Sequence, residues 1–145
     1  MSEVKKAAFG FKDYEVSEFA FKRPPNTNND SFSIGFAPTG EYNNSDSTFI
    51  MTLGFNASYE MEDGGKSIDV INLILKATFT FDEGTSIDEI PDYFYRNSLG
   101  IIYPYLRAFV STLTFQANLK PPMILPIFNL TELEKPFRES VTLIE

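Results

Sequence analysis

The sequence predicts an α+β domain in which a four-stranded antiparallel sheet carries its helices on one face. Two patterns lead to this prediction. Apolar and polar residues alternate through the first half of the chain, and apolar residues recur at spacings of three and four after Gly84. Strands first and helices last are typical of an antiparallel sheet with helices gathered on one side. The chain has 145 residues, the length of one domain, so we expect residues 1–145 to fold as a single domain.

The clearest strand is predicted at residues 48–62, because the odd positions are apolar and the even ones are mostly polar or small. Residues 62–66 (Glu-Asp-Gly-Gly-Lys) then predict a hairpin turn. A second long strand follows at residues 67–81. We expect these two strands to pair antiparallel.

Two less regular strands are predicted before this hairpin. Residues 9–21 form a long β stretch, and residues 32–36 alternate briefly between apolar and small or polar side chains. The stretches 26–30 and 40–46 are rich in Asn, Asp, Gly and Ser, which is typical of connecting loops.

The main helix is predicted from Ile101 to Gln116, because apolar residues at spacings of three and four form a wide stripe on one side. A short helix is predicted at residues 91–96, and residues 97–100 (Asn-Ser-Leu-Gly) should separate the two. Pro104 must lie in the first turn of the main helix or kink it. Residues 131–140 could add a last helical turn or two.

The tail between these helices is apolar but broken by proline. Residues 120–128 read Lys-Pro-Pro-Met-Ile-Leu-Pro-Ile-Phe, and the prolines forbid a regular helix or a central strand. We therefore expect this segment to pack onto the domain in extended form.

The composition limits the function classes. The chain contains neither Cys nor His, which removes the usual zinc ligands, disulfides and nucleophile–base pairs. Acidic residues are common in turns and at the start of helices, which explains the pairs Asp82-Glu83 and Asp88-Glu89 without a catalytic site. We expect no catalytic residue, no metal site and no cofactor, and hence a protein that is not an enzyme.

The charge balance narrows the partners. Twenty acidic residues against twelve basic ones give a net charge of −8, which repels phosphate groups. We therefore expect neither nucleic acid nor an anionic membrane as a partner. The sequence shows no signal-peptide pattern and no apolar run of about eighteen residues, so we expect a cytoplasmic protein without membrane insertion.

The predicted main helix contains a specific motif. Residues 102–107 (Ile-Tyr-Pro-Tyr-Leu-Arg) resemble the aromatic-Pro-Tyr-x-Arg motif in the main helix of the bacterial export chaperone SecB. Residues 125–130 (Leu-Pro-Ile-Phe-Asn-Leu) are similar to that family's Pro-Val-Asn-Phe segment with one residue inserted. Residues 19–24 are similar to the end of its first strand. The resemblance spans residues 9–133, although only the helix motif is specific.

This resemblance implies a SecB-like fold and a homotetramer built as a dimer of dimers. It also implies ATP-independent binding of unfolded preproteins and their delivery to the export motor SecA. The family's acidic docking positions for SecA correspond to Glu18, Lys22, Val70 and Asn72 in this chain. Because only Glu18 is acidic, we expect weak or no binding to SecA.

Apolar residues in the second strand region and the tail are candidate contacts for polypeptide clients. They are Phe32, Ile34, Phe36, Tyr42, Phe115, Met123, Ile124, Ile127, Phe128 and Leu130. Packing in the core is the alternative for these residues. The predicted oligomer contacts are Tyr103, Tyr105, Phe109 and Leu113.

The leading functional hypothesis is an ATP-independent holding chaperone for unfolded or partly folded polypeptides, with protein export as the family's use. The alternative is a dedicated partner-binding module on the same fold, such as an antitoxin chaperone or a phage or mobile-element protein, without general chaperone activity. An enzyme or small-ligand carrier is a third class, for which the sequence offers no convergent polar groups.

Overall fold

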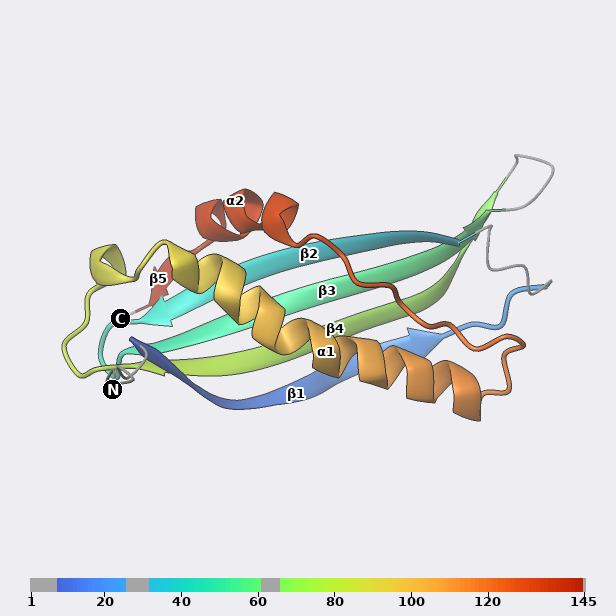
Figure 1. The fold of residues 1–145 in the computed structure, drawn as a ribbon, viewed down its shortest axis with the longest axis horizontal. Coiled ribbons are helices and arrows are strands. Elements are labelled where there is room, and N and C mark those ends of the chain that lie inside the picture. The colour runs from blue at the N-terminus through green and yellow to red at the C-terminus, as the bar shows by residue number, and fades with distance from the viewer. Residues whose placement is uncertain (1–7, 26–31, 61–65, 145) are drawn as a thin grey trace, which may run out of the picture.

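The computed structural model describes residues 8–25, 32–60 and 66–144, which form one sheet with helices on one face (Figure 1). The sheet has five strands in the order β1-β4-β3-β2-β5. The elements in chain order are β1 (Phe9–Phe21), β2 (Phe32–Asn43), β3 (Thr48–Glu60), β4 (Ser67–Phe81), a 3-10 helix (Ile87–Glu89), α1 (Tyr93–Gln116), α2 (Thr131–Glu139) and β5 (Thr142–Ile144). The predicted α+β class with a mainly antiparallel sheet is confirmed.

The two long strands β3 and β4 form the centre of the sheet and pair antiparallel, as predicted. Leu53 of β3 lies opposite Leu75 of β4. Every second residue of β3 from Phe49 to Tyr59 is buried, because one face of the sheet meets the helices and the other meets solvent. The predicted turn residues 62–65 lie outside the described residues.

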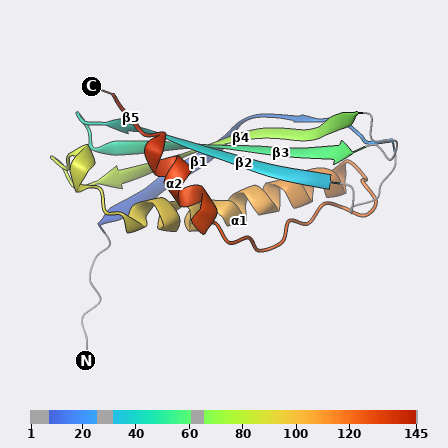
Figure 2. The same cartoon turned by 90° about the horizontal axis from the view of Figure 1, so that it is seen from above.

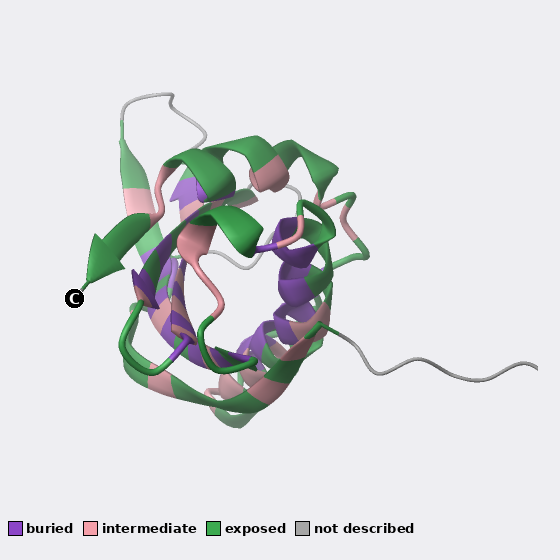
Figure 3. Cartoon of the chain, turned by 90° about the vertical axis from the view of Figure 1, so that its left-hand side faces the viewer, coloured by how far each residue is buried: buried purple, intermediate pink, exposed green. Residues whose placement is uncertain are grey.

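Helix α1 packs across the inner face of the sheet (Figure 2). Aromatic rings form the centre of the core. The Phe94 ring on α1 lies 4.7 Å from the Phe49 ring on β3 and 5.4 Å from the Phe79 ring on β4. Both pairs meet edge to face, the arrangement that the ring quadrupoles favour. The buried residues accordingly gather between the sheet and α1 (Figure 3).

Helix α1 begins earlier than predicted and is continuous over 24 residues. The predicted interruption at residues 97–100 is therefore wrong, and the separately predicted short helix forms the first turn of α1. Ser98 Oγ donates a hydrogen bond to the Tyr95 carbonyl (3.3 Å), and Leu99 is buried in the core. Tertiary packing of this turn overrides the low helix propensity of Asn, Ser and Gly. Pro104 lies in the helix interior.

Strand β2 extends further than predicted, so the connector expected at residues 40–46 is wrong over its first part. Gly40 and Tyr42 face the core, and the Tyr42 hydroxyl donates to the Thr85 carbonyl (2.5 Å). The fifth strand, β5, pairs parallel with the end of β2 and was not predicted. Three residues are too short a stretch for alternation to be recognised.

Helix α2 confirms the predicted helical turns after residue 130. Its Phe137 is buried in the core. Glu134 accepts hydrogen bonds from Arg96 of α1 (3.2 Å) and from Arg138 (3.5 Å), and Arg138 lies over the Tyr95 ring (5.1 Å). These contacts tie α2 to the first turns of α1. None of the helices in the described part of the chain has the length and hydropathy to cross a membrane.

The packing of β2 against the core gives a stability prediction. A Cβ atom at Gly40 would lie 2.5 Å from a ring carbon of Phe49 and 3.2 Å from one of Phe137. We expect Gly40→Ala to lower the free energy of unfolding by about 1–3 kcal/mol. Gly35→Ala on the same strand is the control, since nothing lies within 4 Å of its added Cβ, and it should change stability by less than about 0.5 kcal/mol. Equal urea midpoints for the two variants would contradict this placement of β2.

Candidate functional site

A proline-broken segment joins α1 to α2 and lies extended beside α1 (Figure 1). We call residues 119–130 the strap. Pro121, Pro122 and Pro126 lack the backbone donor that a helix interior or a central strand requires. The strap accordingly forms neither helix nor strand, as predicted.

The first anchor of the strap is a threonine of α1. Thr114 Oγ1 donates a hydrogen bond to the Val110 carbonyl (2.9 Å) and accepts one from the backbone N–H of Met123 (2.9 Å). Thr114 and Met123 are both buried, so neither polar group has water as an alternative partner. The hydroxyl therefore fixes the strap to the last turns of α1.

Two residues of the helix motif form the next anchors. The Nε–H of Arg107 donates to the Leu125 carbonyl (2.6 Å), and the Tyr103 hydroxyl donates to the Pro126 carbonyl (2.5 Å). Burial raises the pKa of Tyr103, and the Arg107 guanidinium opposes this with a smaller effect. The phenol therefore stays protonated at neutral pH and remains a hydrogen-bond donor.

The anchored strap turns some apolar side chains inwards and leaves others in solvent. Met123 and Leu125 are buried, whereas Ile124 is 64% exposed and Ile127 is 91% exposed. Phe115, near the end of α1, is 66% exposed. A single exposed apolar residue is ordinary, but a group of them marks an interaction surface.

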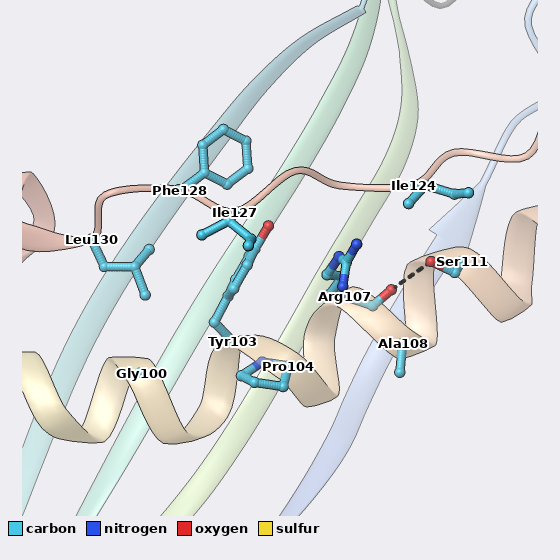
Figure 4. A pocket seen from close by; sticks show the side chains of 10 residues that line it. All are labelled: Gly100, Tyr103, Pro104, Arg107, Ala108, Ser111, Ile124, Ile127, Phe128 and Leu130. Carbon is cyan, nitrogen blue, oxygen red and sulfur yellow. Dashed lines mark hydrogen bonds between the residues drawn. The ribbon is translucent and has the colours of Figure 1, made fainter.

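An apolar groove lies between the strap and α1 (Figure 4). Its volume is about 520 Å³. A second hollow of about 390 Å³ shares Ser111 and Ile124 with it and extends to Phe115 and Pro122. We call the two together the strap groove. The first hollow is lined by Gly100, Tyr103, Pro104, Arg107, Ala108, Ser111, Ile124, Ile127, Phe128 and Leu130.

The lining of the strap groove determines what it can bind. Among the described residues, Arg107 is the one charged side chain of its lining, and most of the remaining lining is aliphatic or aromatic. Such a surface offers apolar contact area together with a single cation. Among the described residues, no group of three or more Asp, Glu, His or Cys side chains is arranged to hold a metal ion.

No protein-family model matches the chain. The chain is 28% identical over 133 residues to the uncharacterized protein MJ0357 of Methanocaldococcus jannaschii, which covers 90% of this chain and 84% of that protein. A similar solved structure is the Mycobacterium tuberculosis SecB-like chaperone Rv1957 in complex with a ChAD peptide from the antitoxin HigA1. It matches this chain with a TM-score of 0.65 and 20% sequence identity, and the match covers 84% of this chain and 91% of that chain. This chain has a SecB-like fold.

The fold brings Phe36, one of the predicted client contacts of β2, next to the strap. Phe32, Ile34 and Phe36 occupy alternate positions of β2, on the face that also carries the core residues of β3. The Phe36 ring lies 5.5 Å from the Phe128 ring and 5.9 Å from the Tyr103 ring. Phe36 and Phe128 therefore connect this part of β2 to the strap groove.

Three residues of the predicted client and oligomer surfaces are buried instead. Tyr42 is fully buried, because it points to the face of the sheet that the helices cover. Met123 is buried with Thr114, and Tyr103 is buried where it anchors the strap. We correct these three assignments, because Tyr42 supports the core and the other two position the strap.

The other predicted oligomer contacts lie on the β1 side of α1. The Tyr105 ring lies 4.4 Å from the Tyr14 ring, and the Phe109 ring lies 5.2 Å from the Phe19 ring. Tyr14, Phe19 and Tyr105 are exposed, and Phe109 and Leu113 are half-buried. We call Tyr14, Phe19, Tyr105 and Phe109 the aromatic side of the domain.

A β-bulge changes the predicted docking surface for SecA. The register of β3 and β4 shifts at Val70, which turns inwards and is fully buried, whereas Asp69 faces outwards and is exposed. The assignment of Val70 to the docking surface is therefore wrong, since regular alternation does not hold through a bulge. Glu18 and Asn72 line a hollow of about 430 Å³ on the outer face of the sheet. Lys22 is exposed at the end of β1.

Apart from Phe115, the α1 side of the strap groove was not predicted from the sequence as a client contact. Gly100, Pro104 and Ala108 recur every four residues, which places them along one line of the helix. Their small side chains leave room between α1 and the strap. This spacing is visible in the sequence and could have located the groove, but Gly100 was predicted to break the helix.

The Thr114 anchor gives a prediction for the strap. We expect Thr114→Val to lower the free energy of unfolding by about 1–3 kcal/mol, because the buried Met123 N–H loses its acceptor. Native-state hydrogen exchange should become faster at the Met123 amide. Thr112→Val, at an exposed position of the same helix, is the control and should change stability by less than about 0.5 kcal/mol. Unchanged exchange at Met123 in Thr114→Val would show that this anchor does not hold the strap.

Proposed function

We propose that this protein is an ATP-independent holding chaperone that binds unfolded or partly folded polypeptides along the strap groove. The exposed apolar strap carries the proposal, because Ile124, Ile127 and Phe115 lie on one continuous surface outside a complete core. Contiguous apolar surface of this kind is typical of an interaction site. No catalytic step is part of the proposal.

The strap cannot bury the exposed side chains of Ile124 and Ile127 by folding inwards. Its backbone is fixed by the anchors from Thr114, Arg107 and Tyr103, and Met123 and Leu125 already occupy the inward positions. A client that buries one exposed aliphatic side chain of the strap gains about 1.5–3 kcal/mol if the burial is complete. Part of this gain is offset by ordering the client, which favours reversible binding.

A second candidate function is a dedicated chaperone for one partner. The observation that favours it is the similar structure from Mycobacterium tuberculosis, whose SecB-like chaperone is in complex with a peptide from an antitoxin. The two candidates share the strap groove but differ in client range. A chain that protects several unrelated unfolded proteins acts as a general chaperone, and one that binds a single partner is dedicated.

The strap side chains allow a direct test of client binding. We expect Ile127→Ser to weaken the suppression of client aggregation several-fold without ATP, because it removes exposed apolar area from the groove. Leu143→Ser is the control, since Leu143 is also an exposed aliphatic residue but lies on β5. Light scattering of a chemically unfolded client measures both variants. Equal protection by Ile127→Ser, Leu143→Ser and the wild type would contradict a role for the strap groove.

We also propose that the protein forms a homo-oligomer through β1 and the aromatic side. β1 is an edge strand, with β4 as its neighbour in the sheet. Tyr14 and Phe19, which belong to β1, are 41% and 54% exposed. An edge strand flanked by apolar surface favours pairing with another chain. A second copy of the chain can cover this region and form a dimer. The homotetramer implied by the SecB resemblance needs one further contact surface, between two such dimers.

Static light scattering tests this part of the proposal. We expect the wild type to have a multiple of the chain mass at micromolar concentration and Phe19→Glu to shift to smaller species, because a charge would be buried in the contact. Leu143→Glu, at the other end of the sheet order, should keep the wild-type mass. A monomeric wild type would rule out this oligomer.

We propose that SecA is at most a weak partner. Asp69 restores one carboxylate on the outer face of the sheet, but the Lys22 ammonium lies at the end of the same strand as Glu18. A cation within an acidic docking surface opposes a basic partner.

A further inference from the structure

We infer that the strap groove favours apolar segments that carry an Asp or Glu side chain, whose carboxylate Arg107 binds. This inference rests on the proposed function and names the class of client segment that the groove selects. It concerns Arg107, the one charged group of the lining among the described residues, of which the strap anchor uses only the Nε–H.

The Arg107 head group retains donors for an occupant of the groove. Its Nε–H is used by the Leu125 carbonyl. Among the described residues, no carboxylate lies within ion-pair distance of Arg107. Figure 4 shows its nitrogen atoms beside the strap between Ile124 and Ile127. A guanidinium has five N–H donors, so those on the two terminal nitrogens remain to bind a carboxylate at two points.

The surroundings of Arg107 favour a carboxylate over a cationic side chain in the bound segment. The rest of the lining is mostly apolar, and an apolar segment bound against it shields the exposed Arg107 from water, which strengthens a contact between opposite charges. A Lys side chain at the same place in a client would instead meet a like charge. The net charge of −8 acts in the opposite direction over long distances, attracting basic clients, but salt screens that field more than a direct contact.

The position of Arg107 favours an internal carboxylate over the end of a chain. The strap groove runs along α1 from Gly100 to Phe115, about 22 Å at the rise of an α-helix. Arg107 lies near its middle, about 10 Å from Gly100. An extended occupant therefore places about three residues on each side of the carboxylate. Apolar lining lies on both sides, with Ile127 and Phe128 on one and Phe115 on the other.

Fluorescence anisotropy at moderate salt tests the inference with four labelled peptides on one apolar sequence. Three carry Asp, Asn or Lys at the centre, and the fourth ends there with Asn and a free C-terminal carboxylate. The Asp and Asn peptides differ in charge and hardly in size. We expect the wild type to bind the Asp peptide roughly fivefold more tightly than the Asn peptide, and the Lys peptide more weakly than either.

Variants of the protein then assign this preference to Arg107. In Arg107→Met the ratio between Asp and Asn peptides should fall to about one, whereas Arg107→Lys should keep part of it. The readout is the ratio within each variant, because loosening the strap lowers the affinity for all peptides alike. Lys76→Met removes the same charge from the outer face of the sheet and should leave the ratio unchanged.

The outcomes separate the inference from the proposed function. Equal affinities of the wild type for the Asp and Asn peptides overturn the inference, and so does a preference that survives in Arg107→Met. Tighter binding of the peptide that ends in a free carboxylate overturns the choice of an internal side chain. Failure of every peptide to bind overturns the proposed function itself.

Discussion

The backbone of the strap is the constraint on which the rest of the site depends. Its prolines exclude a regular helix or a central strand, so its polar groups need partners from elsewhere. Thr114, Arg107 and Tyr103 supply these partners, and they can do so only because α1 is one continuous helix. The same anchors hold Ile124 and Ile127 outwards. Apolar exposure at the groove is thus a consequence of how the strap backbone is satisfied.

Much of the fold could be predicted from the sequence, because long strands with one buried face carry a clear alternation. β3 and β4 were recognised in this way, and the helical spacing located most of α1. Three features required the tertiary structure. The bulge at Val70 changes which side chains of β4 face the core before Ile71. Gly40 is part of β2 rather than a connector, and the Phe49 ring beside it leaves no room for a side chain. β5 is held by its pairing with β2.

The candidate site was predicted on the strap, on β2 and at Phe115 in the last turn of α1, but not on the rest of α1. Apolar residues in a segment that cannot be regular are visible in a sequence, so Ile124, Ile127 and Phe128 could be named. Whether each side chain points inwards depends on the anchors, and for this reason Met123 was wrongly placed on the surface. The motif residues Tyr103 and Arg107 could be recognised, but their contacts with the strap carbonyls follow only from the fold.

The SecB-like fold and the strap groove support one account, in which a rigid helix presents an apolar strap to unfolded chains. Methyl-resolved NMR of isoleucine side chains, during titration with an unfolded client, tests it most directly. Ile124 and Ile127 report on the groove, and Ile50 and Ile74 report on the outer face of the sheet. We expect the methyl signals of Ile124 and Ile127 to shift or broaden on client binding, while those of Ile50 and Ile74 stay in place. Changes confined to Ile50 and Ile74 would contradict it.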